Sequence, residues 1–283
     1  MALNEKVIGK KYSVPPVEIS AHESIYYALA YGDDNDAYFD NRREGGIIAP
    51  PMYAVKYASG PVVEIIMDQE VGLNFMMVVH YSQEFEWLKP VKPNDSIKTE
   101  GVIKKIEIKE KGSILGWETI STNQNGEIVL KANWEFFDRS AGSGIPEEKK
   151  EEEAQVHDIL WTQAVKVKNG QTFIYAEPSG DYNPIHADDA FAKQVGLPGI
   201  ILQGLCTMAF AHKAVTDNLT GPYRNPLLVK KLKVRFARPL LPGQTITYQA
   251  YKIGTEAGGT KYGIIARNDE GKDVLRDCWC IIG

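Results

Sequence analysis

The amino-acid sequence contains one structural unit twice, and this repeat limits the possible folds more than any other feature. YALAYGDDND, Tyr27 to Asp36, aligns with YAEPSGDYNP, Tyr175 to Pro184, and the two share Tyr-Ala, Gly-Asp and Asn at the same spacing. GGIIAPPMYAV then aligns with PGIILQGLCTM, and EWLKPVKPNDSI aligns with RFARPLLPGQTI. Because a repeated sequence indicates a repeated structural unit, we expect both halves to contain the same elements in the same order.

The segment between the two copies predicts a linker. DRSAGSGIPEEKKEEEAQ is small and glycine-rich and then densely charged. Charge runs of this kind are usually solvated connections, although an acidic patch with its own function is the alternative. We therefore place the first unit at 1–140, the linker at 141–155 and the second unit at 156–283. A chain of 283 residues suits two domains, since domains usually contain about 100 to 200 residues.

Each copy shows a short strand, a polar loop, a helix and several strands. In the second copy GLCTMAFAHKAVTDNL is apolar on nearly every face of a helix, which predicts that other elements surround it. LLVKKLKVRFARPL alternates apolar and basic residues, so it should be a strand with one buried face. We expect an α+β fold in which an antiparallel sheet wraps a long central helix in each half. In the first copy, a Gly-Pro pair at Gly60 and Pro61 should shorten or unwind that helix.

The composition excludes several classes of function. Hydrophobic residues make up 43% of the chain and charged residues 24%, as in an average soluble protein. A net charge of -5 without long basic blocks argues against nucleic acid as a partner. The chain has no apolar run of membrane-spanning length and no signal-peptide core, so we expect no membrane association. Three cysteines give no disulfide framework, and Cys278 and Cys280 fit the alternation of a strand.

The second copy carries a candidate catalytic cluster in SGDYNPIHADDAF, Ser179 to Phe191. Asp181, Asn183 and His186 place a carboxylate, an amide and an imidazole within six positions, and a glycine and a proline restrain the loop. A carboxylate and an imidazole together can take and give protons near neutral pH. The alternative is a polar turn that leads into a helix, since Asp and Asn are common turn residues.

A comparison of the two copies favours chemistry over a turn. The first copy keeps the aspartate and the asparagine but has Tyr38 at the position of His186 and Pro51 at the position of Gly204. The helix that begins at Gly204 would bring free backbone N–H groups near the loop, and such groups stabilise a developing oxyanion. A base, an acid and an oxyanion site are then available together in the second copy.

SGDYNPIHADDAFAKQVGLPGIILQGLCTMAF resembles the signature of the MaoC-like (R)-specific enoyl-CoA hydratases, called hydratase 2, with Gly-Asp-x-Asn-Pro-Ile-His in order. In the first copy, LNFMMVVHYSQEFEWLKPV is similar to the N-terminal half of the two-domain members, such as the hydratase unit of the peroxisomal multifunctional enzyme. The resemblance covers nearly the whole chain. It implies a double hotdog fold in which only the C-terminal unit is catalytic. Because the first unit has Tyr38 at the position of the histidine and a Gly-Pro break in its helix, we expect its interior to accommodate the acyl chain.

The resemblance also implies roles for individual residues. Asp181 and His186 would hold and activate water, Asn183 would support their geometry, and the backbone N–H of Gly204 would bind the thioester oxygen. Many relatives have histidine where Gln203 stands, and we expect only a tuning effect because the implied donor is main chain. The implied reaction is the reversible addition of water to a trans-2-enoyl-CoA, giving a (3R)-hydroxyacyl-CoA. Coenzyme A enters as part of the substrate, and we expect no other cofactor and no metal.

Two other functions stay open. One is a dehydratase that acts on branched, dicarboxylic or carrier-protein-bound acyl thioesters, which would share the mechanism. The other is a non-catalytic acyl-CoA binding protein that keeps the loop without turnover. We also expect a homodimer, and the lack of a peroxisomal C-terminal tripeptide favours a cytoplasmic location.

The remaining charged and imidazole side chains show no clear site pattern. We treat the scattered histidines as structural because they lack metal-ligand spacing; they are His22, His80, His157 and His212. The basic residues on and after the alternating strand could meet the phosphates of coenzyme A or could lie on a solvated strand face; they are Lys230, Lys231, Lys233, Arg235 and Arg238.

Overall fold

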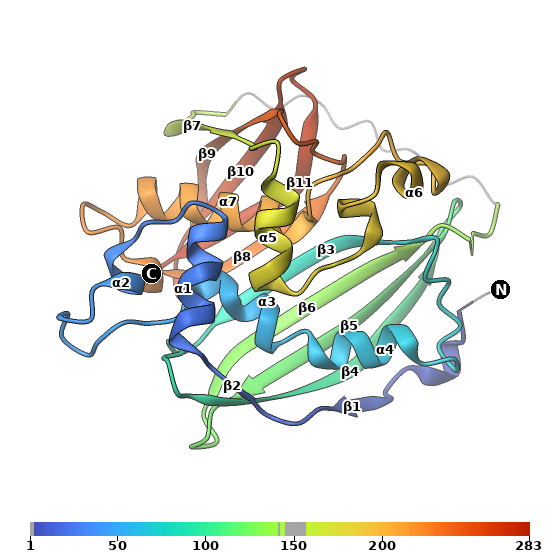
Figure 1. The fold of residues 1–283 in the computed structure, drawn as a ribbon, viewed down its shortest axis with the longest axis horizontal. Coiled ribbons are helices and arrows are strands. Elements are labelled where there is room, and N and C mark those ends of the chain that lie inside the picture. The colour runs from blue at the N-terminus through green and yellow to red at the C-terminus, as the bar shows by residue number, and fades with distance from the viewer. Residues whose placement is uncertain (1–2, 141, 145–156) are drawn as a thin grey trace.

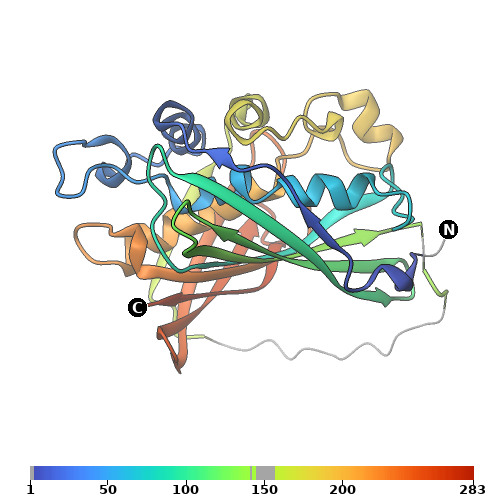
Figure 2. The same ribbon diagram turned by 90° about the horizontal axis from the view of Figure 1, so that it is seen from below.

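The structure is a computed structural model, and it describes residues 3–140, 142–144 and 157–283 (Figure 1). The predicted linker at 141–155 lies outside the described residues except for 142–144, and the domain boundaries stay a prediction. Figure 2 shows the helices on one side of a sheet whose other side they leave uncovered.

The described strands form one antiparallel sheet in the order β1-β4-β5-β6-β3-β8-β11-β10-β9-β7, and β2 pairs with β4. The first copy contributes β1 (Lys11–Ser13), β2 (Val17–Glu18), β3 (Val78–Trp87), β4 (Ser96–Ile108), β5 (Ser113–Thr122) and β6 (Ile128–Asp138). The second contributes β7 (Trp161–Lys166), β8 (Val229–Phe236), β9 (Thr245–Glu256), β10 (Gly259–Asn268) and β11 (Asp273–Ile282). The copies join where β3 pairs with β8, so each half of the sheet belongs to one copy.

The helices of the two copies occupy corresponding places on the sheet. They are α1 (Ala21–Ala30), α2 (Asp36–Phe39), α3 (Ala54–Tyr57), α4 (Gly60–Met67), α5 (Gln171–Ser179), α6 (Asp189–Gln194) and α7 (Gly204–Leu219). α1 and α5 lie side by side (Figure 1). Tyr27 and Tyr175, which align in the repeat, share a hydroxyl–hydroxyl hydrogen bond of 2.7 Å. A contact between equivalent residues indicates an approximate twofold axis between the copies.

The central helices of the two copies differ. In the second copy α7 is continuous over 16 residues and is buried on most faces. In the first copy the corresponding segment is divided into a 3-10 turn, Pro51–Tyr53, then α3 and α4, with an interruption between Tyr57 and Gly60. The predicted interruption is confirmed, but it lies at Ala58 and Ser59, immediately before the Gly-Pro pair. Gly60 and Pro61 form the first turn of α4, where proline is tolerated because the first helical N–H groups have no intrahelical acceptor.

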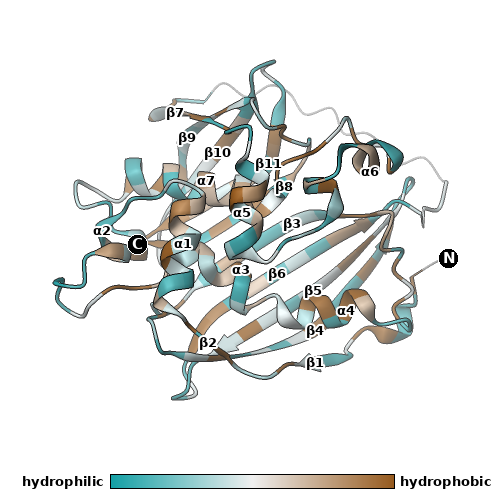
Figure 3. Ribbon diagram, viewed as in Figure 1, coloured by the Kyte–Doolittle hydropathy of each residue, from teal (hydrophilic) through white to brown (hydrophobic). Residues whose placement is uncertain are grey.

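The hydrophobic core lies between the helices and the inner face of the sheet. Along β8 the apolar Leu232 and Val234 are buried, while the alternating Lys231 and Lys233 are half-buried on the opposite face, as the sequence alternation predicted. Figure 3 shows the same alternation of apolar and polar positions along the strands. The indole N–H of Trp134 donates to the Thr119 hydroxyl at 3.0 Å, so the buried indole is satisfied.

Cys206, Cys278 and Cys280 are buried and unpaired, and the last two lie in β11 as predicted from their spacing. Among the described residues, none of the helices has the length and apolar character that crossing a membrane requires.

Candidate active site

The loop that follows α5 is shaped by short-range hydrogen bonds. Gly180 adopts a φ of 76°, a left-handed conformation that glycine reaches without strain, and its N–H donates to the Ala176 carbonyl at 2.8 Å. The Asp181 carboxylate accepts from the N–H of Asn183 at 3.3 Å. The Asn183 side chain in turn accepts from the N–H of Ile185 at 3.2 Å. The loop therefore holds the Asp181 side chain in a defined orientation before any long-range contact is made.

His186 ends the 3-10 turn that the asparagine caps, and it is 7% exposed. Its Nδ1 lies 2.8 Å from the carbonyl oxygen of Ile201. Because a carbonyl only accepts, Nδ1 must carry the proton and donate. In the neutral ring Nε2 then presents a lone pair.

That lone pair faces the carboxylate of Asp181. The distance from His186 Nε2 to Asp181 Oδ2 is 3.6 Å, which is too long for a good direct hydrogen bond. Both atoms are acceptors, and a water molecule has two protons to donate. The geometry therefore suits a single water held by both side chains, with an oxygen lone pair free to attack. The Asp181 side chain is 40% exposed, so the pair is open to solvent or substrate on one side.

The segment before α7 is tied to the same loop. The N–H of Ile201 donates to the Ile185 carbonyl at 3.2 Å. The Gln203 amide donates to the carbonyl of Thr172 at 2.9 Å and approaches that of Asp181 at 3.5 Å. These bonds fix the start of α7 against the loop that carries the carboxylate and the imidazole.

Gly204 is the first residue of α7, and its N–H has no hydrogen-bond acceptor within the described part of the chain. Helices leave their first N–H groups without intrahelical partners, and the helix dipole adds positive potential there. A side chain at this position would meet the ring of Phe236, since a Cβ would lie 3.1 Å from it. Glycine therefore keeps the N–H accessible in a narrow space.

The structure thus brings together all four residues singled out in the sequence. Asp181 and His186 face each other, Asn183 braces the loop, and Gly204 opens the helix beside it. Sequence analysis did not identify the Ile201 carbonyl as the group that orients the imidazole. A backbone carbonyl has no sequence signature, because every residue carries one.

The corresponding loop of the first copy has the same turn without the same chemistry. Asp33 accepts from the N–H of Asn35 at 3.2 Å, and Asn35 caps the next turn, as in the second copy. Tyr38 is fully buried at the imidazole position, and its hydroxyl has no partner among the described residues. Pro51, at the position of Gly204, has no N–H to offer.

Burial also raises the pKa of Asp33, the carboxylate of the first-copy loop. Asp33 is 1% exposed, and desolvation raises its pKa to about 6. The guanidinium of Arg224 lies 3.5 Å from Asp33, 3.0 Å from Asp34 and 2.7 Å from Asp217. The first-copy loop is therefore engaged in a charge cluster that bridges the two copies.

The other histidines all contact aromatic rings, but the two buried ones are not fully hydrogen-bonded: both ring nitrogens of His212 and Nε2 of His80 lack a partner among the described residues. His212 is fully buried on α7 against Trp87, and burial lowers its pKa to about 3. His80 packs between aromatic rings, and burial lowers its pKa to about 4. His157 stacks on Tyr251. Within residues 3–140, 142–144 and 157–283, no group of His, Cys, Asp or Glu side chains could hold a metal ion.

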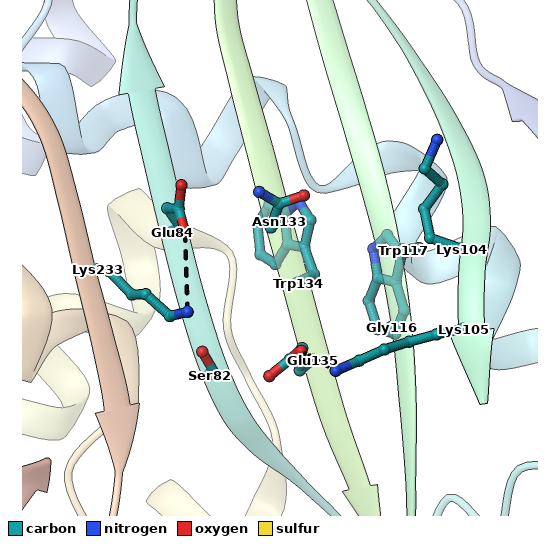
Figure 4. Close-up of a pocket in the computed structure, with 10 residues that line it drawn as sticks. All are labelled: Ser82, Glu84, Lys104, Lys105, Gly116, Trp117, Asn133, Trp134, Glu135 and Lys233. Carbon is teal, nitrogen blue, oxygen red and sulfur yellow. Dashed lines mark ion pairs between the residues drawn. The ribbon is translucent and has the colours of Figure 1, made fainter. Parts of the chain in front are cut away.

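Lys231 and Lys233 of β8 lie on the face of the sheet opposite the buried Leu232 and Val234. Lys231 pairs with Glu86 at 3.1 Å, and Lys233 approaches Glu84 to 3.9 Å. A hollow of about 220 Å³ lies on this face, where Lys105 pairs with Glu135 at 2.6 Å. Figure 4 shows the residues that line it. These lysines are thus on a solvated, charge-paired strand face, remote in the fold from the loop at Asp181.

Comparison with known proteins gives a consistent assignment for both halves. The model of the MaoC like domain matches residues 152–271, and the model of the FAS1-like dehydratase domain region matches residues 6–132. The chain is 28% identical over 259 residues to a protein of Dictyostelium discoideum named probable enoyl-CoA hydratase 2, covering 88% of this chain and 87% of that protein.

Two further relatives have related names. The chain is 28% identical to the peroxisomal enoyl-CoA hydratase 2 of Arabidopsis thaliana, covering 81% of this chain and 80% of that one. It is 29% identical to the peroxisomal multifunctional enzyme type 2 of Mus musculus, covering 82% of this chain. The match spans only 32% of the mouse protein, so the chain corresponds to about a third of that enzyme.

Solved structures show the same fold. A MaoC-like dehydratase from Phytophthora capsici superposes with a TM-score of 0.81 at 23% identity, covering 100% of this chain and 98% of the other. A protein of Mycobacterium tuberculosis described as a double hotdog fold superposes with a TM-score of 0.61 at 14% identity, covering 97% and 95% of the two chains. The predicted double hotdog architecture is therefore confirmed.

Proposed function

Since the chain belongs to the MaoC-like dehydratases, in the two-domain form with relatives named enoyl-CoA hydratase 2, we propose that it is an (R)-specific enoyl-CoA hydratase. The reaction adds water reversibly to a trans-2-enoyl-CoA and gives a (3R)-hydroxyacyl-CoA. It makes the protein a hydro-lyase. The observation that carries the proposal is the pair of facing acceptors, Asp181 Oδ2 and His186 Nε2, beside the free N–H at the start of α7.

In the hydration direction, a water held by Asp181 and His186 attacks C3 of the enoyl group. The pair takes a proton from the water and delivers a proton to C2, so the two carbon atoms gain one hydroxyl and one hydrogen. The Ile201 carbonyl holds the imidazole in the tautomer that can accept. Because the two side chains act on one water, the proton transfers belong to the pair rather than to either residue.

The negative charge that develops during attack is delocalised onto the thioester oxygen. The N–H of Gly204 and the positive end of α7 are available to stabilise it, and such donors act strongly because they are already oriented. Loss of one donor of this kind usually costs about 10²- to 10³-fold in kcat. The proposal requires no metal and no cofactor beyond the coenzyme A of the substrate.

The equivalent loop of the first copy lacks the groups that the proposed mechanism requires, which supports an active site in the second copy. It has neither the imidazole nor the free N–H, so one active site per chain is proposed. The interrupted helix, α3 and α4, lies beside the catalytic loop, since the Lys56 ammonium would lie 3.3 Å from a Cβ on Gly180. We place the acyl chain on this side, where Val63 and Met67 of α4 are 57% and 70% exposed. The acyl-chain length and the homodimer stay predictions.

The test is hydration of trans-2-enoyl-CoA substrates of increasing chain length, followed by loss of the enoyl thioester absorbance and analysis of the product's configuration. We expect the (3R) product. His186→Ala should lose turnover, while His157→Ala, which alters a histidine stacked on Tyr251, is the matched control and should keep it. A (3S) product, or wild-type turnover in His186→Ala, would refute the assignment.

The alternative substrates share this site and need their own measurement. Branched, dicarboxylic and carrier-protein-bound enoyl thioesters should be compared in the same assay by kcat/KM. A higher value for any of them would assign the substrate to that class without changing the mechanism. An absence of turnover with all thioesters, together with tight acyl-CoA binding, would support the non-catalytic alternative.

A further inference from the structure

A second cavity opens in the first copy, with a volume of about 180 Å³. It lies among the segments that contain Pro51, Leu88 and Leu227, so residues from both copies form its walls. We call it the vestigial cavity, because its lining residues Pro51 and Trp87 align with Gly204 and Phe236 of the second copy.

Backbone hydrogen bonds establish this correspondence. The same pattern of donors and acceptors occurs in both copies, at similar lengths. The equivalent pairs are Ala49–Val91 at 2.8 Å and Leu202–Leu240 at 2.7 Å, and Lys89–Val129 at 3.4 Å and Arg238–Val274 at 3.2 Å. By this alignment Trp87 occupies the position of Phe236, the residue whose ring lies against Gly204. Trp87 likewise contacts the equivalent position, donating its indole N–H to the Pro51 carbonyl at 2.9 Å.

The groups that would react with a bound thioester are missing from this cavity's copy. Tyr38 replaces the imidazole, and Pro51 provides no N–H for an oxyanion. Asp33, the counterpart of the catalytic carboxylate, is within 3.5 Å of the Arg224 guanidinium. A thioester in the vestigial cavity would therefore not be converted.

The binding features, in contrast, are present. Leu88 and Leu227 line the cavity and are 45% and 36% exposed, so its rim is apolar. The ammonium of Lys230 donates to the Leu227 carbonyl at 2.8 Å and has no carboxylate partner in the described residues. Lys89 at the same cavity pairs with Glu127. An apolar cavity with one uncompensated cation is complementary to a ligand with an apolar end and an anionic remainder.

The volume of the vestigial cavity limits the size of the ligand group that it can hold. Engineered apolar cavities of about 150 Å³ bind benzene, so the vestigial cavity can hold a group of that size but not a whole acyl-CoA. A short acyl chain fits this limit, with the coenzyme A part outside and near Lys230.

We infer that the vestigial cavity binds a short-chain acyl-CoA without turnover, as a second site for the ligand class of the active site. The class of ligand rests on the proposed function, whereas the existence of the cavity does not. The site would allow substrate or product to bind the chain away from the reacting groups.

The experiment uses hexanoyl-CoA, which is saturated and cannot be hydrated, in calorimetric titration of the full chain. We expect two sites per chain. Leu227→Trp, which fills the cavity from its rim, should leave one site, and Lys230→Glu should weaken the second site at least about two- to fivefold, the scale of an exposed ion pair. Leu160→Trp is the matched control, since Leu160 is exposed and lies outside the cavity, and it should keep both sites.

A single site in the wild-type chain, or two sites that both variants leave unchanged, would overturn the inference. Equal filling of both sites by coenzyme A without an acyl group would also overturn it, because the cavity would then not bind the acyl end. Enoyl-CoA turnover of the same preparations separates the two proposals. Turnover with one binding site rejects only the second site, and two binding sites without turnover reject only the proposed function.

Discussion

The proposed joint binding of one water by Asp181 and His186 predicts that their contributions to catalysis are not independent. The perturbation is a double-mutant cycle with Asp181→Asn and His186→Gln. Both replacements keep a polar side chain of similar size, and the glutamine amide could still donate toward the Ile201 carbonyl that accepts from the native imidazole. The cycle therefore tests the chemistry with the smallest change in packing.

The expected coupling between the two substitutions follows from the 3.6 Å separation between Asp181 Oδ2 and His186 Nε2. At this distance one water can contact both atoms, so in the proposed mechanism the loss of either acceptor releases the same nucleophile. General acid–base groups usually contribute about 10²- to 10⁴-fold, which corresponds to about 2.7–5.5 kcal/mol of activation free energy. Each single variant should lose about this much, and the double variant should lose little more than the worse single variant.

The assay measures kcat and kcat/KM for enoyl-CoA hydration by each variant. Thermal unfolding verifies that each variant is folded. The expected coupling free energy is about the size of the smaller single effect. If the double variant instead loses the product of the two single factors, the side chains act on different atoms and the shared-water geometry is refuted. His157→Gln should leave both constants unchanged, which controls for the removal of an imidazole elsewhere.

Three further predictions follow from buried groups. Because burial raises the folded-state pKa of Asp33 to about 6, from the ordinary 3.8, its ionisation costs stability as pH rises from about 4 to 6. Asp33→Asn should then raise the free energy of unfolding at pH 8 by up to about 3 kcal/mol and by much less below pH 4, measured by urea denaturation; destabilisation at pH 8 would contradict this. Burial lowers the pKa of His212 to about 3, so the unfolded chain binds its proton first and stability falls as pH drops below about 6.5. His212→Phe should flatten that acid slope, and an unchanged slope would reject the explanation. Gln203→Leu removes the amide donor to the Thr172 carbonyl and should cost about 1–3 kcal/mol of stability; a fall in kcat as large as that of the catalytic variants would contradict the predicted tuning role.

The shape of the loop that carries Asp181 and His186 could be predicted because it depends on neighbours in the chain. The bond from the N–H of Asn183 to Asp181 spans two residues, and the bond from Ile185 to Asn183 spans two as well. Asp and Asn side chains often form such contacts with the backbone two residues further on, so a segment with Gly, Asp, Asn and Pro in this order favours them. The repeat and the alternation along β8 also predicted the fold from neighbouring residues, because the period of apolar residues indicates which face of an element is buried.

The contacts that complete the site join segments far apart in the sequence. The imidazole is oriented by the carbonyl of Ile201, 15 residues away. Gln203 reaches back 31 residues to Thr172. The residue types at Ile201 and Thr172 do not predict these bonds, because the acceptors are backbone carbonyls, which every residue has. Only the packing of the chain brings these carbonyls within hydrogen-bond distance.

The sequence by itself determined that two equivalent units would form, that one would keep an imidazole and a free helix start, and where the first copy's helix would break. Only the tertiary structure decided that Arg224 of the second copy would engage Asp33 of the first, and that a cavity would persist beside Pro51. Burial periodicity and turn hydrogen bonds are encoded within a few neighbouring residues. Ion pairs and cavities between the copies depend instead on how the two folded units pack against each other.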